Sequence, residues 1–159
     1  MASNHVSYLD PIAVGISCPR KLNFMAKEEL FNNPLFSRYL FSIKTFPVKR
    51  DSADLSAIKE AIRRVDKGEG LVLFPEGSRR FDGTSREPYA GIGFLAAKLD
   101  VPVIPAFVKG TDQALPAGTK NIKLTKVSVY FGKQISIERR MPYQDIASHI
   151  MDSIRHLSC

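Results

Sequence analysis

The stretch LVLFPEGSRR, residues 71–80, decides the fold, because a continuously apolar run is followed at once by a polar turn. Residues 71–75 are apolar without alternation, which is typical of a strand buried on both faces of a sheet. Four small or polar residues follow: Glu76, Gly77, Ser78 and Arg79. They predict a tight turn that presents polar groups and backbone N–H donors at the carboxyl end of the strand. Ligands of parallel sheets bind at this end, although an ordinary surface loop fits the same residues.

The spacing of apolar residues on both sides of this stretch predicts the other strands and helices. Strands are predicted at residues 22–26, 71–75, 101–108 and, with the alternation typical of a sheet edge, 126–132. Helices are predicted at residues 27–42, 53–67, 90–99 and 142–157. In the helix at 53–67, Asp51 or Ser52 would form the N-cap and Gly68 would end it. Strands that alternate with helices predict one α/β domain over residues 1–159, with a mostly parallel sheet flanked by helices.

Composition narrows the class of protein. Hydrophobic residues make up 44% of the 159-residue chain and charged residues 25%, which excludes general disorder. Lys and Arg total 23 against 16 Asp and Glu, a net charge of +7 that suits an anionic membrane surface, a phosphorylated substrate or nucleic acid. No zinc-ligand spacing or aromatic-basic RNA motif occurs, so nucleic acid is not an expected partner. Every apolar run is shorter than the roughly 18 residues of a transmembrane helix.

The segment NHVSYLD, residues 4–10, holds a candidate acid–base pair, His5 and Asp10. Histidine suits general-base chemistry near neutral pH, and a carboxylate on its second ring nitrogen fixes the tautomer. On a straight helix the two side chains would point about 140° apart. A loop that enters a helix at Asp10-Pro11 would instead bring them together. Alternatively, Asp10 only caps the helix and His5 is a frayed terminal residue. His149 and His156, on the predicted last helix, are expected at the surface.

The segment FPVKR, residues 46–50, is a second apolar run that ends in cations. Lys49 and Arg50 would hold an anionic head group at the same sheet edge, or they are solvated charges ahead of a helix.

Four blocks in this order resemble a known family: NHVSYLD (4–10), FPVKR (46–50), FPEGSRR (74–80) and VPVIP (101–105). The chain resembles the lysophosphatidic acid acyltransferases (1-acylglycerol-3-phosphate O-acyltransferases) of the PlsC-like glycerolipid acyltransferase family. The resemblance runs from Asn4 to about Gly132. Each block is short, but all four in order and at natural spacings are highly specific.

The resemblance implies an activity and a set of site residues. His5 and Asp10 would be the catalytic pair that activates the free hydroxyl of lysophosphatidic acid, which then attacks an acyl thioester and gives phosphatidic acid. The acceptor would be bound by Arg50, Glu76, Gly77, Ser78 and Arg79. Residues 101–105 would shape the site and the acyl-chain region. No metal and no organic cofactor is expected, and the acyl donor would be acyl-CoA or acyl-carrier-protein as co-substrate. The alternatives are another lysophospholipid acceptor, an acyl-thioester hydrolase and an inactive lipid-binding module.

The resemblance also implies a membrane-associated protein on the cytoplasmic face. Family members carry hydrophobic helices and a strand before the first block, whereas three residues precede Asn4 here, so we expect a domain truncated at its N-terminus. Residues 34–46 are a candidate segment for contact with an anionic membrane surface, because apolar and aromatic residues alternate there with Arg38 and Lys44. The other interpretation is a short helix packed on the sheet.

Overall fold

The structure is a computed structural model that describes residues 1–49, 54–77, 87–119, 121–138 and 140–158. Its contacts divide the chain into two units. The first unit consists of Met1–Cys18 together with Phe74–Cys159, and the second is Pro19–Leu73.

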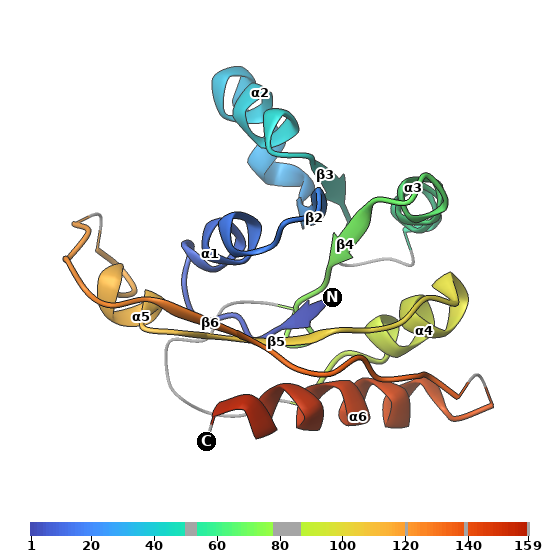
Figure 1. Ribbon diagram of the computed structural model, residues 1–159. Helices are drawn as coiled ribbons and strands as arrows, with labels where there is room; N and C mark the ends of the chain where they lie inside the picture. The colour runs from blue at the N-terminus through green and yellow to red at the C-terminus, as the bar shows by residue number, and fades with distance from the viewer. Residues whose placement is uncertain (50–53, 78–86, 120, 139, 159) are drawn as a thin grey trace. The chain divides into compact units, whose positions relative to one another are not determined.

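The first unit contains a three-stranded sheet with helices on both faces. Its elements are β1 (Ala2–Ser3), α1 (Asp10–Ser17), α4 (Ala90–Leu99), β5 (Pro105–Lys109), α5 (Thr111–Ala114), β6 (Ser128–Phe131), α6 (Tyr143–Arg155) and a 3₁₀ turn (His156–Ser158). The strand order is β1-β5-β6, with β1 parallel and β6 antiparallel to β5. Helices α4 and α6 cover one face of this sheet and α1 lies on the other (Figure 1). The order places β6 at an edge, as its alternating sequence predicts.

The core of the first unit lies between the sheet and the pair α4 and α6. Its buried members are Ala2, Ala96, Val103, Ile146, Ile150, Met151 and Ile154. Isoleucines four residues apart place one apolar stripe of α6 against the sheet. Gly93 lets the two helices approach closely, since a Cβ built there would lie 1.8 Å from the backbone oxygen of Tyr143. Sheet and helices therefore form a tightly packed support beneath the loops at the strand ends.

The second unit is a parallel sheet with its own helices. Its elements are β2 (Leu22–Lys27), a 3₁₀ turn (Glu28–Phe31), α2 (Pro34–Ser42), β3 (Thr45–Val48), α3 (Leu55–Asp66) and β4 (Gly70–Val72). The strand order is β3-β2-β4 and both pairings are parallel (Figure 1). Polar groups fix α3 to this sheet: Arg64 Nη1 donates to Asn23 Oδ1 at 2.6 Å, and its guanidinium lies 4.6 Å from the centre of the Phe46 ring.

The start of α3 is held by Asp54. Its carboxylate accepts hydrogen bonds from the backbone N–H groups of Ser56 and Ala57, which are unpaired donors of the first helical turn. A further hydrogen bond from the Lys49 N–H, together with those from Ser56 and Ala57, lowers the pKa of Asp54 to about 2. The N-cap of α3 is Asp54, so the prediction that Asp51 or Ser52 forms the N-cap is wrong. Gly68, with a positive φ of 78°, follows the helix end as predicted.

Most predicted elements are confirmed, and the α/β class with a mostly parallel sheet flanked by helices is confirmed as well. The helix at 90–99 has the predicted bounds. The continuous helix predicted at 27–42 is wrong, because β2 extends to Lys27 and Pro34 starts a new helix after the 3₁₀ turn. The strand predicted at 101–108 begins only at Pro105, and the one predicted at 71–75 is Gly70–Val72.

Helix α2 buries little of its apolar surface. Leu40 is its buried residue, whereas Leu35 is 83% exposed and Phe41 is 54% exposed. Helix α2 also contacts β3, and its contact with a membrane surface stays a prediction. Within the described ranges, the helices are all too short or too polar to cross a bilayer.

Candidate active site

The loop between β1 and α1 is anchored at its first residue. Asn4 follows β1, and its side chain makes two hydrogen bonds with the backbone of Val108: Asn4 Nδ2 donates to the carbonyl at 2.9 Å, and the Val108 N–H donates to Asn4 Oδ1 at 2.7 Å. The Asn4 side-chain amide thus makes the two hydrogen bonds to β5 that the backbone of one more β1 residue would make. Asn4 is buried, so this anchor fixes the backbone immediately before His5.

His5 and Asp10 form the pair that the sequence predicts. His5 Nδ1 lies 2.8 Å from Asp10 Oδ2, and the histidine side chain is 13% exposed while that of Asp10 is fully buried. The carboxylate accepts a hydrogen bond, so Nδ1 of the neutral ring carries the proton and Nε2 carries the lone pair. Asp10 is the first residue of α1 and Leu9 is the N-cap, so the alternative in which Asp10 merely caps the helix is wrong.

Asp10 is held by donors from three directions besides His5. Its Oδ2 accepts from the backbone N–H groups of Val6 at 2.6 Å and Ser7 at 2.7 Å. Its Oδ1 accepts from the hydroxyl of Thr111 at 2.5 Å. Thr111 begins α5 directly after Gly110, whose φ of 90° turns the chain at the end of β5. A carboxylate in this setting cannot rotate without breaking several hydrogen bonds, so it fixes the imidazole ring.

The segment after β4 lies against the other side of His5. The Phe74 ring stacks on the imidazole with centroids 4.2 Å apart and an interplanar angle of 23°. Glu76 Oε1 accepts from the backbone N–H of His5 at 3.3 Å, and Glu76 is 4% exposed. The predicted turn therefore contacts His5, and Glu76 contacts the His5 backbone.

Gly77 adopts a conformation that favours glycine. Its φ is +67°, and a Cβ there would lie 2.5 Å from a ring carbon of Tyr89. The turn is closed by the Gly77 N–H, which donates to the Phe74 carbonyl at 2.9 Å, and by the Tyr89 N–H, which donates to the Pro75 carbonyl at 3.0 Å. A tight turn at Glu76 and Gly77 is thus confirmed.

The structure does not test the other predicted site residues. Ser78, Arg79 and Arg50 lie outside the described residues. Lys49 is exposed, and its Nζ lies 3.9 Å from Glu28 Oε2.

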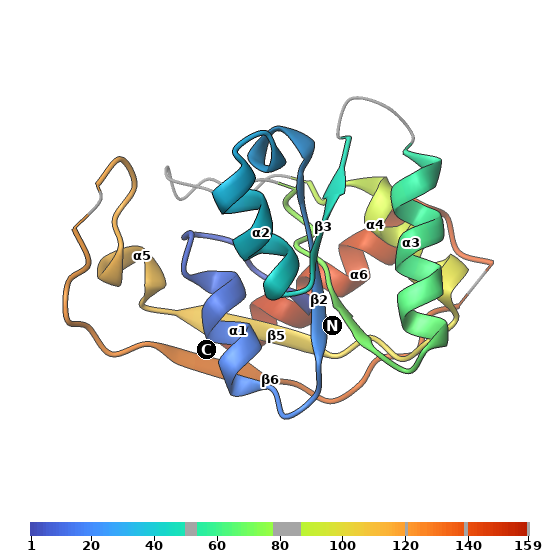
Figure 2. The ribbon, with the colours of Figure 1, turned by 90° about the horizontal axis from the view of Figure 1, so that it is seen from above.

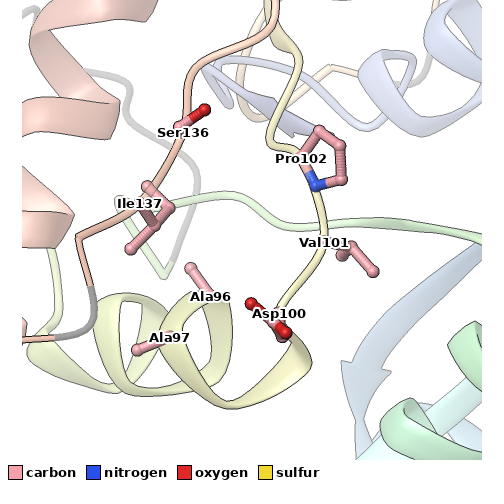
Figure 3. Close-up of a pocket in the computed structure, with 7 residues that line it drawn as sticks. All are labelled: Ala96, Ala97, Asp100, Val101, Pro102, Ser136 and Ile137. Atoms are coloured by element: carbon pink, nitrogen blue, oxygen red, sulfur yellow. The ribbon is translucent and has the colours of Figure 1, made fainter.

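The segment 101–105 precedes β5, at the end of that strand opposite to Val108 and Thr111. Val101 and Pro102 line a shallow pocket there with the end of α4 and residues 136 and 137 (Figure 3). A role of this segment in the acyl-chain region stays a prediction. His149 and His156 are exposed on and after α6, as predicted.

Sequence reasoning missed the positioning residue Thr111. It is fully buried and lies 101 positions from Asp10 in the chain, so no local spacing connects the two. The available signal was its place after the apolar strand, at the carboxyl end where ligand-binding loops gather.

This geometry can be compared with known proteins. A family model described as Acyltransferase matches residues 1–109, a range that contains His5, Asp10, Glu76 and Gly77. The chain belongs to the Acyltransferase family.

The similar proteins compared here are named 1-acyl-sn-glycerol-3-phosphate or LPA acyltransferases. The chain is 32% identical over 122 residues to the chloroplastic 1-acyl-sn-glycerol-3-phosphate acyltransferase BAT2 of Brassica napus, covering 76% of the chain and 35% of that protein. It is 29% identical over 136 residues to the 1-acyl-sn-glycerol-3-phosphate acyltransferase of Bacillus subtilis, covering 85% and 65%. The crystal structure of the LPA acyltransferase PlsC from Thermotoga maritima superposes with a TM-score of 0.80 at 25% identity, covering 99% of the chain and 64% of PlsC. The chain thus spans about a third to two thirds of the length of these relatives.

Proposed function

We propose that this protein transfers a fatty acyl group from an acyl thioester to the free hydroxyl of lysophosphatidic acid, giving phosphatidic acid. The observation that carries the proposal is the 2.8 Å contact of His5 Nδ1 with the buried Asp10 carboxylate. The names of the similar proteins supply the reaction class, since each of those compared above is a 1-acylglycerol-3-phosphate acyltransferase.

In the proposed mechanism His5 Nε2 is the general base. It takes the proton from the acceptor hydroxyl as the oxygen attacks the thioester carbonyl, and Asp10 stabilises the imidazolium that forms. The tetrahedral intermediate then collapses, the C–S bond breaks, and the proton on Nε2 passes to the departing thiolate. A positioned base contributes roughly 10²–10⁴-fold to such a reaction. The steps require neither a metal nor an organic cofactor, because the thioester is already activated.

The acceptor is proposed to bind at the turn after β4. Ser78 and Arg79, which follow Gly77 in the sequence, have side chains suited to a phosphate. Arg50 is proposed as a second phosphate ligand. Arg50→Ala is then expected to raise the KM for lysophosphatidic acid more than it lowers kcat.

The lipid acceptor also implies action at an anionic membrane surface. Exposed Leu35 and Phe41 on α2, with the exposed Arg38 between them, support contact of this helix with lipid. We propose that the protein works on the cytoplasmic face of a membrane.

The test is an assay of the purified chain with labelled acyl-CoA or acyl-carrier-protein and lysophosphatidic acid. We expect phosphatidic acid as the main product, and we expect His5→Ala to abolish transfer while the circular dichroism spectrum is unchanged. His149→Ala is the matched control, because His149 is an exposed histidine of α6. Activity of His5→Ala close to that of the wild type would refute the mechanism.

Two product ratios separate the alternatives. If the donor yields more free fatty acid than phosphatidic acid at saturating acceptor, the protein is an acyl-thioester hydrolase instead. Faster acylation of lysophosphatidylcholine than of lysophosphatidic acid would indicate another lysophospholipid acceptor, in conflict with the proposed phosphate ligands.

A further inference from the structure

A long interval between α5 and α6 carries positive charge only. From Gln113 to Ile137 the sequence contains no Asp or Glu, but it contains Lys120, Lys123, Lys126 and Lys133. We call residues 116–127 the lysine-rich loop. It connects α5 to β6 and alternates cations with aliphatic residues, in the order Lys-Asn-Ile-Lys-Leu-Thr-Lys-Val at 120–127. No carboxylate in this interval offsets the positive charge of the loop.

The aliphatic residues of the lysine-rich loop are exposed rather than packed. Leu124 is 107% exposed and Ile122 is 71% exposed. Lys123 and Lys126 beside them are exposed too. The strand that follows adds two aromatic rings, because Tyr130 is 47% and Phe131 is 42% exposed on the edge strand β6. In both views the loop extends from the sheet beyond α5 (Figures 1 and 2).

Short hydrogen-bonded steps connect this loop to the catalytic pair. The Lys123 N–H donates to the Ala114 carbonyl at 2.7 Å, which ties the middle of the loop to α5. Thr111, at the start of α5, donates to Asp10, and the Ser7 hydroxyl donates to the Leu115 carbonyl at 3.3 Å. All of these groups belong to the first unit. The loop is therefore fixed close to the active site and is not a remote appendage.

We propose that the lysine-rich loop is a membrane-contact element that inserts Ile122 and Leu124 between the head groups of an anionic bilayer. Lys123 and Lys126 would pair with lipid phosphates at the depth of the head groups. The proposal deepens the proposed function, since a lipid acceptor must reach His5 from a membrane. It assigns that contact to a surface of the first unit, distinct from α2 of the second unit.

An acidic carrier protein is the other partner that a basic surface near an acyltransferase site can bind. The aliphatic residues favour the bilayer: two fully or largely exposed aliphatic side chains on a basic loop gain most by entering lipid. A protein partner held by charge requires no such pair. The two partners are separated by the experiments below.

The chain contains no tryptophan, so a single tryptophan can report insertion. Leu124→Trp places it on the loop, and Tyr143→Trp is the control at the start of α6, which lies at the opposite end of the first unit (Figure 1). With vesicles of equal parts phosphatidylcholine and phosphatidylglycerol, we expect the emission of Leu124→Trp to shift to the blue and to be quenched by brominated acyl chains. The emission of Tyr143→Trp is expected to stay unchanged. Absence of a shift and of quenching at position 124 would overturn the proposal.

Charge is tested by co-sedimentation with the same vesicles. The double change Lys123→Gln/Lys126→Gln is expected to weaken binding about 30-fold, since each cation at an anionic surface contributes roughly fivefold. Lys59→Gln/Lys67→Gln removes two exposed lysines from the region of α3 and is expected to change binding less than threefold. Ile122→Ser/Leu124→Ser is expected to weaken binding about tenfold with all charges kept. If the α3 control and the lysine variant of the loop weaken vesicle binding equally, binding depends only on the net charge of the protein. That result would overturn the assignment of membrane contact to the loop.

Failure of this proposal can be told apart from failure of the proposed function. With lysophosphatidic acid in detergent micelles and acyl-CoA as donor, the loop variants are expected to keep their activity within about twofold, because the dyad is intact. If the wild type transfers no acyl group in any assay, the proposed function is refuted, whatever the result with vesicles. Normal vesicle binding by the lysine variants with a raised KM for acyl-carrier-protein alone would assign the loop to the carrier protein instead.

Discussion

The hydroxyl of Thr111 donates to Asp10 Oδ1 at 2.5 Å, which joins the loop after β5 to the carboxylate that orients His5. Both residues are fully buried. The other oxygen of the same carboxylate contacts the imidazole, so Thr111 acts through Asp10 and is a positioning residue.

Thr111→Val is expected to lower kcat about tenfold and to leave the KM for lysophosphatidic acid unchanged. The valine has nearly the same shape but no donor, so Asp10 loses a hydrogen bond of the charge-assisted kind, which contributes about 1.5–3 kcal/mol. Steady-state kinetics measures both constants. Thr111→Ser restores the hydroxyl and is expected to recover most of kcat; a serine variant as slow as the valine variant would contradict the positioning role.

Glu76 gives a second kinetic test, because its position allows two roles. If its main role is to hold the His5 backbone through the 3.3 Å hydrogen bond, Glu76→Gln keeps an acceptor oxygen and should retain kcat within about threefold, whereas Glu76→Ala should lose more than tenfold. A role in acceptor binding would instead raise the KM in both variants. We expect the kcat pattern, measured at saturating donor over a range of acceptor concentrations.

Two glycines of α4 should respond in opposite directions to the same change. Gly93→Ala is expected to destabilise the protein by about 2 kcal/mol or more, because the new Cβ would lie 1.8 Å from the Tyr143 carbonyl oxygen of α6. Gly91→Ala places its Cβ where no atom lies within 4 Å and is expected to be neutral or to stabilise by about 0.5 kcal/mol. Urea denaturation followed by circular dichroism gives both values, and equal destabilisation by the two changes would contradict the close α4–α6 approach.

Asp54 should make the stability of the second unit depend on pH. Its pKa is lowered from 3.8 to about 2 by hydrogen bonds from Lys49, Ser56 and Ala57, so the charged form stabilises the folded state. This stabilisation is complete above about pH 4 and is lost as the pH falls through 2.

Asp54→Ala is therefore expected to cost about 1 kcal/mol at neutral pH, as for other N-caps, and the difference from the wild type should shrink between pH 4 and 2. Hydrogen exchange of the α3 amides at several pH values measures it. A difference that stays constant down to pH 2 would show that the charge of Asp54 has no part in capping.

Local patterns predicted the elements whose signals lie within one segment. The helix Ala90–Leu99 and the end of α3 at Gly68 follow from apolar spacing and glycine conformation. The pair of His5 and Asp10 was predictable because a loop followed by Asp10-Pro11 at a helix start brings the two together. The break at Pro34 was visible in the sequence too, but apolar spacing on both sides obscured it.

Contacts between distant segments were not predictable in the same way. The hydrogen bond from Thr111 to Asp10 and the stacking of Phe74 on His5 depend on strand order and register, which no single window of sequence contains. The division into a β1-β5-β6 sheet and a β3-β2-β4 sheet is another result of pairing between distant residues.

The side-chain amide of Asn4 ends the β1 ladder, and the loop that carries His5 begins at the same residue. This leaves no slack in the chain before His5: one residue inserted between positions 4 and 5 would displace the imidazole by about one strand repeat, roughly 3.3 Å, while leaving every side chain of the pair in the protein. The length of the connection, and not only the identity of its residues, is thus part of what brings His5 to Asp10.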